Sequence, residues 1–151
     1  NKMERISNVN ITFKEMEIIN QLKTKSEKLV AFCVICISKT FADEKGVFYA
    51  KANTVAKLTG LNINTVKRIL YHVLAEKNLV EIVEHGQYID KRDSKKRYIP
   101  FCRPNKYKLL ISSDGNTIYN VNSDNIIHHF KQCYLVSGLE VSRRFKQWLT
   151  K

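Results

Sequence analysis

Residues 55–70 read Val-Ala-Lys-Leu-Thr-Gly-Leu-Asn-Ile-Asn-Thr-Val-Lys-Arg-Ile-Leu, and this stretch decides the fold. Ala56 is small at the position where two short helices would cross closely. Gly60 suits a tight turn between those helices, where the backbone needs a left-handed conformation. Val66 would face back onto the first helix, and Asn62 is the expected N-cap of the second. The stretch therefore predicts two short helices joined by a turn.

The second of these helices, expected from about 62 to 77, has a polar outer face. In the major groove of DNA, Asn pairs with adenine, Arg pairs with guanine, and the Thr methyl contacts thymine. Lys and Tyr side chains more naturally reach phosphates. The alternative is an ordinary helical hairpin whose polar face is only solvated. The candidate DNA-binding residues on this helix are Asn62, Asn64, Thr65, Lys67, Arg68, Tyr71 and His72.

Two more helices are predicted before this stretch. Thr12, with Glu15 three residues later, matches a capping box at the start of the first helix. Ser26 is expected to cap a second, strongly apolar helix that runs to about Thr40.

Strands are expected on both sides of the helical pair. A turn would lead into a short strand at 47–50, and the alternating residues 79–84 predict another. Residues 85–97 are expected to form a loop, and 98–110 a return strand kinked near its prolines. The order is helix, helix, strand, helix, helix and β-hairpin. This order predicts a winged helix-turn-helix, an α+β fold made mainly of helix.

The expected hairpin tip is rich in basic residues. Such a wing would lie along the phosphate backbone, where it supplies affinity but little sequence information. The alternative is a solvated loop whose charges only maintain solubility. The candidate DNA-binding residues of the wing are Lys91, Arg92, Lys95, Lys96 and Arg97.

The charge of the whole chain is strongly positive and unevenly distributed. The 26 Lys and Arg residues exceed the 14 Asp and Glu residues, which gives a formal net charge of +12. Residues 51–110 carry 13 basic and 5 acidic side chains, a net +8, whereas residues 1–50 and 111–151 each carry a net +2. The excess therefore coincides with the helical pair and the wing, which indicates a polyanionic partner such as nucleic acid.

Residues 26–83 resemble the winged-helix domains of plasmid and phage replication proteins, namely RepA-type initiators and phage replisome organisers. The resemblance rests on Gly-Val-Phe-Tyr at 46–49, Leu-Thr-Gly at 58–60 and Thr-Val-Lys-Arg at 65–68. The glycine usual at the end of the second helix is Asn78 here, which also tolerates a left-handed turn. The resemblance implies sequence-specific binding of double-stranded DNA in replication initiation or maintenance of a bacterial mobile element, with other replication or partition proteins as further partners.

Other roles remain open at this point. MarR-like transcriptional regulators share much of the same pattern, and a plasmid-partition protein that binds a centromere would need a similar domain. A winged helix that binds protein rather than DNA is an alternative of another class. The net charge of residues 51–110 favours DNA, because a protein-binding winged helix needs no such excess.

Enzymatic and metal-binding motifs are not found in the sequence. No phosphate-binding glycine loop, Gly-x-Ser-x-Gly turn or paired carboxylates on one helix face occur. Cys33 and Cys36 lie in an apolar run without a second close pair, which favours buried thiols over a zinc or redox site. We therefore expect no catalytic activity, no cofactor and no metal. The absence of an apolar run of about 20 residues and of a signal peptide predicts a cytoplasmic protein without a membrane partner.

The C-terminal residues 111–151 differ in character from the winged-helix domain expected over 1–110. A polar, turn-rich segment with a possible strand at 117–121 precedes two predicted helical pieces, at about 124–135 and 139–149. The apolar side chains of these pieces favour a helical extension that holds a homodimer together. The alternative is that they cover the core of their own chain.

Overall fold

A computed structural model describes residues 8–92, 98–113, 115–122, 124–126 and 128–129, with the backbone alone for 87–92 and 98–103. The helical elements are α1 (Phe13–Asn20), α2 (Lys25–Phe41), α3 (Ala52–Thr59), α4 (Ile63–Ile69) and the π-helical turn η2 (Leu70–Leu74) that continues α4. The strands are β1 (Val9–Thr12), β2 (Val47–Tyr49), β3 (Val80–Glu84), β4 (Gln87–Arg92), β5 (Tyr98–Arg103), β6 (Lys106–Leu109) and β7 (Thr117–Val121).

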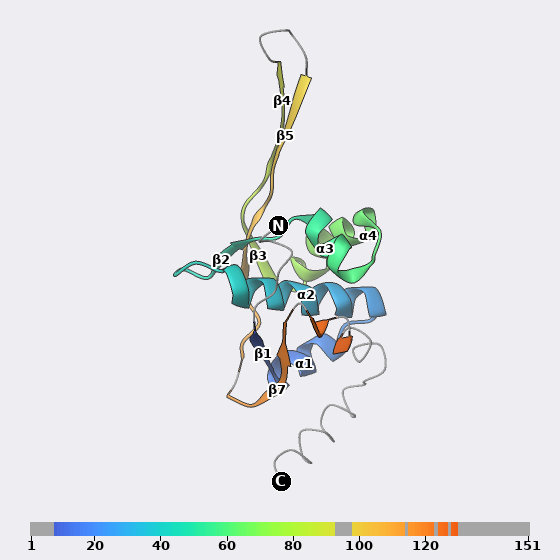
Figure 1. The fold of residues 1–151 in the computed structure, drawn as a ribbon, viewed down its shortest axis with the longest axis vertical. Coiled ribbons are helices and arrows are strands. Elements are labelled where there is room, and N and C mark those ends of the chain that lie inside the picture. The colour runs from blue at the N-terminus through green and yellow to red at the C-terminus, as the bar shows by residue number, and fades with distance from the viewer. Residues whose placement is uncertain (1–7, 93–97, 114, 123, 127, 130–151) are drawn as a thin grey trace.

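The described residues form a mixed α+β fold, as the sequence predicted, with small antiparallel sheets. One sheet has the strand order β2-β6-β3, and β1–β7 and β4–β5 form two-stranded sheets. Figure 1 shows α2 across the middle of the molecule, with α3, α4 and the β4–β5 hairpin on one side and α1, β1 and β7 on the other. The β4–β5 hairpin projects away from the other elements.

Helix α2 is the centre of the core. Every residue from 29 to 38 is buried, because other elements pack against the helix on both sides. A helix that is apolar all round is stable only in such a position. Cys33 and Cys36 are buried thiols with no exposed surface, as predicted, and burial raises the pKa of Cys33 to about 12.

The start of α1 agrees with the sequence prediction, and the start of α2 does not. At α1 the predicted capping box is formed, and the Thr12 backbone N–H donates to Glu15 Oε1 at 2.9 Å. At α2 the N-cap is Thr24, whose Oγ1 accepts from the Glu27 backbone N–H at 3.1 Å. Ser26 lies inside the first turn instead. The physical reason is spacing: Glu27 follows Thr24 by three residues, and that spacing completes a cap.

The region predicted as a loop from 85 to 97 is partly strand. Residues 87–92 pair with 98–103 in an antiparallel register that aligns Gln87 with Arg103. The predicted return strand at 98–110 is divided into β5 and β6, with Pro104 and Asn105 between them. A hairpin that projects into solvent needs no alternation of apolar and polar residues. The charged segment 87–92 therefore lacks the pattern from which a strand is predicted.

The N-terminal strand β1 was not predicted from the sequence, and its partner lies near the C-terminal end of the described residues. Strand β1 pairs with β7, aligning Val9 with Val121, and β7 confirms the strand expected at 117–121. Ile11, Val121 and Ile126 are buried in the same core as α2. The predicted helices at about 124–135 and 139–149 lie largely outside the described residues.

Candidate nucleic-acid interface

The turn between α3 and α4 has the geometry that the sequence predicted. Gly60 ends α3 with φ 74°, in the left-handed region. Asn62 caps α4, where its Oδ1 accepts from the Asn64 backbone N–H at 2.8 Å. Val66 is fully buried and Ala56 is half-buried against the core. These contacts fix the direction in which α4 presents its outer face.

The outer face of α4 is polar, basic and free of acidic residues. Asn64, Lys67 and Arg68 are exposed, and Thr65 is half-buried. No Asp or Glu occurs between Ile63 and Ile69. The sequence therefore placed this group of side chains correctly on the solvent side, and nothing within the helix itself neutralises Lys67 and Arg68.

The two candidate residues that follow α4 lie in η2 and differ from the rest. Tyr71 was expected to face away from the core, but it is half-buried and packs against it. A π-helical turn holds an extra residue, which changes the faces on which the following side chains lie. His72 is exposed, and its Nδ1 lies 3.7 Å from Oε1 of the equally exposed Glu76. An acidic neighbour makes His72 a poorer phosphate contact than Lys67.

The basic hairpin lies on the same side of α2 as α3 and α4 (Figure 1). Lys91 and Arg92 are at the described end of β4, where their Cα atoms pair with Ile99 and Tyr98. Lys95, Lys96 and Arg97 lie outside the described residues. The backbone of β4 and β5 thus carries two candidate cations away from the core on a two-stranded support.

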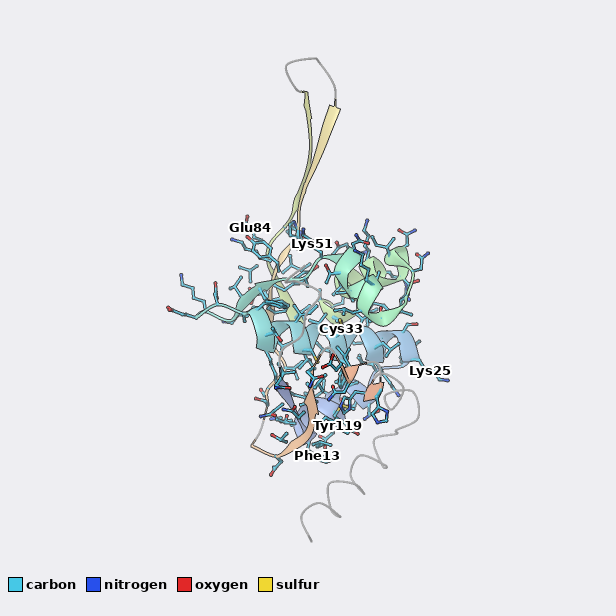
Figure 2. The ribbon with its side chains drawn as sticks, in the orientation of Figure 1. Phe13, Lys25, Cys33, Lys51, Glu84 and Tyr119 are labelled. Atoms are coloured by element: carbon cyan, nitrogen blue, oxygen red, sulfur yellow. The ribbon has the colours of Figure 1, made fainter. Side chains whose placement is uncertain are left out.

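The hairpin side of α2 carries cations that no sequence motif marks. Lys51 is exposed at the start of α3, on this side of α2 (Figure 2). Lys106 Nζ lies 3.4 Å from Glu84 Oε2 and 5.5 Å from the centre of the Tyr49 ring. Hydrogen bonding to Tyr49, and then to Glu84, raises the pKa of Lys106. Lys51 and Lys106 both contribute to the positive net charge of residues 51–110, but neither lies in a sequence motif that would mark it as a DNA contact.

Other kinds of site find no support in the part of the chain that the structure describes. Its His, Cys, Asp and Glu side chains include no group of three or more that could hold a metal ion. None of its helices combines the length and apolar character of a membrane span. Comparisons of the chain with protein-family models, curated proteins and solved structures found no match.

Proposed function

We propose that this chain is a winged helix-turn-helix protein that binds double-stranded DNA through α4 and the β4–β5 hairpin. One observation carries the proposal: the acid-free outer face of α4 lies on the same side of α2 as the basic hairpin. A recognition helix and a wing must approach one DNA duplex together, so this shared side is what such a protein needs. The net +8 of residues 51–110 supplies the charge.

In the proposed complex, the N-terminal half of α4 enters the major groove. Asn64 and Arg68 reach base edges, where they prefer adenine and guanine respectively. Lys67 contacts phosphate, and the hairpin follows the adjacent backbone. Asn62 acts by positioning, because its Oδ1 is used by the cap of α4. Tyr71, half-buried, is removed from the set of direct contacts.

A selection from a random duplex library tests the proposal directly. The unmodified chain should enrich one sequence motif, and Asn64→Ala and Arg68→Ala should each lose about 1–3 kcal/mol of preference for it. Lys14→Ala is the matched control, because Lys14 is an exposed cation on α1, across α2 from the interface. That variant should enrich the motif unchanged. Failure of the unmodified chain to enrich any duplex sequence would refute sequence-specific binding.

We propose that the chain acts in replication initiation or maintenance of a bacterial mobile element, because residues 26–83 resemble plasmid and phage replication proteins. Transcription control and partition are the alternatives that share the same DNA-binding domain. The enriched motif separates them by its position, since repeats at an origin, a promoter or a centromere mark three different roles.

We also propose that the chain binds DNA as a homodimer, because one recognition helix reads only a few base pairs. The apolar residues expected to hold the dimer lie mostly beyond residue 129, outside the described part of the chain. Ile126, by contrast, is buried in the core of its own chain. Light scattering at micromolar concentration should give a dimer mass, and a monomer mass both free and on DNA would refute the pairing.

A further inference from the structure

Two strands leave the central sheet together at the base of the hairpin. The ladder between β3 and β6 ends where Glu84 pairs with Lys106, and the ladder between β4 and β5 begins where Gln87 pairs with Arg103. Pro104 lies in this gap and has no backbone N–H to donate. The direction of the hairpin therefore depends on whatever bridges the gap.

The side chain of Asn105 bridges it. Its Oδ1 accepts from the Gly86 backbone N–H at 2.5 Å, which ties the two strands together between the ladders. Its Nδ2 donates to the Tyr107 hydroxyl at 3.2 Å. The amide group of Asn105 thus connects the start of β4 to the centre of the sheet, and both its oxygen and its nitrogen are hydrogen-bonded.

The same line of contacts continues to the end of α4. Tyr107 is 1% exposed, and its ring centre lies 6.1 Å from that of Phe48 in the core. Burial raises the pKa of Tyr107, the hydrogen bond donated by Asn105 lowers it, and the interaction with Tyr71, to which the Tyr107 hydroxyl donates, raises it. Tyr71 belongs to η2, the turn that directly continues α4. Hydrogen bonds therefore connect the recognition helix to the hairpin base through Tyr71, Tyr107 and Asn105.

We propose that Asn105 is a positioning residue that fixes the β4–β5 hairpin relative to α4, so that both elements contact one duplex at the same time. This inference rests on the proposed function. Without the amide, the hairpin would keep its own ladder but lose its fixed angle to the sheet. Its phosphate contacts would then carry an ordering cost at the moment of binding, which lowers affinity.

The experiment compares duplex affinity in two backgrounds. Asn105→Ala should weaken binding roughly fivefold in the unmodified chain. It should weaken binding less than twofold when the five basic residues of the hairpin, Lys91, Arg92, Lys95, Lys96 and Arg97, are already alanine, because a hairpin without its cations gains little from being held in place. Tyr107→Phe, which keeps the buried ring and removes only the hydroxyl, should give a smaller loss with the same dependence on background.

Asn120→Ala is the matched control. Its Nδ2 also makes a side-chain hydrogen bond, to Asn10 Oδ1 at 3.1 Å, but on the β1–β7 sheet across α2 from the hairpin. It should leave duplex affinity unchanged. Equal losses for Asn105→Ala in both backgrounds would show that Asn105 does not act through the hairpin and would overturn this inference alone. Absence of duplex binding by the unmodified chain would overturn the proposed function as well.

Discussion

The two sides of α2 differ in the charged groups that they bury and expose. On the β1–β7 side, a buried carboxylate is paired within the chain: Lys39 Nζ lies 2.6 Å from Glu15 Oε1, and that carboxylate also accepts from Thr12. On the hairpin side, the side of α3 and α4, Lys67 and Arg68 are exposed without an acidic residue on their own helix. Both sides bury apolar residues against α2. The core therefore does not depend on the excess of basic residues. That excess is concentrated in residues 51–110, on the side of α2 where a polyanion could reach it.

The largest expected effect concerns stability alone. Glu15 is fully buried, and its Oε2 has no hydrogen-bond partner among the described residues. Glu15→Ala should lower the free energy of unfolding by about 2–3 kcal/mol, since it removes a capping box and leaves Lys39 without its carboxylate. The figure is reduced because the Lys39 side chain is 24% exposed and partly solvated. Urea denaturation measures the loss.

Glu17→Ala on the exposed face of α1 is the control for this variant and should change the stability by less than about 0.5 kcal/mol. Duplex affinity of Glu15→Ala, measured where the protein is folded, should equal that of the unmodified chain. If the fully folded Glu15→Ala variant bound duplex tenfold more weakly, the two sides of α2 would not act independently, and the comparison would be wrong.

A second variant tests the division of labour on the hairpin side. Replacing Lys95, Lys96 and Arg97 with alanine should weaken binding to the selected motif and to random duplex by the same factor, because phosphate contacts carry little sequence information. The slope of log K against log salt should become shallower by roughly 3. Competition binding at several salt concentrations measures both quantities.

The control makes the same loss of charge outside α4 and the hairpin. Lys14, Lys23 and Lys25 are exposed on or beside α1 and at the start of α2. Replacing all three with alanine should leave the salt slope nearly unchanged. If the two triple variants lose affinity equally, net charge rather than its position determines binding.

The smallest expected effect concerns the turn that sets α4 in place. Gly60 has φ 74°, and a Cβ added there would meet no atom within 4 Å. Gly60→Ala should therefore cost about 1 kcal/mol of stability, from backbone strain alone. Gly115→Ala is the matched control: it also has open space but no such φ, and it should be nearly neutral. Equal melting temperatures for the two variants would contradict this account of the turn.

Local signals explain what the sequence predicted well. Gly60 and Asn62 act on their immediate neighbours, so the turn and the cap of α4 were predicted residue by residue. The exposed face of α4 followed from helical periodicity. Strand β1 was missed because its partner, β7, lies more than a hundred residues away in the chain. Pairing over such a distance leaves no local pattern, since a single short strand depends on tertiary contacts.

The bridge at the hairpin base was hidden for a similar reason. Asn105 follows a proline in a polar segment, which by itself predicts only a turn. Its role depends on Gly86, 19 residues earlier, and on the buried hydroxyl of Tyr107. Tyr71 was placed on the wrong face because a π-helical turn departs from the 3.6-residue period used to predict it.

The salt dependence of binding to double-stranded DNA tests the central claim most directly. Contact with six to eight phosphates by α4 and the hairpin would release that many counterions, and log K should then fall with log salt at a slope of roughly −5 to −7. Fluorescence anisotropy with a labelled duplex across a range of salt concentrations gives the slope. A steep negative slope is the predicted result. A slope near zero would show that the positive excess of residues 51–110 serves something other than DNA.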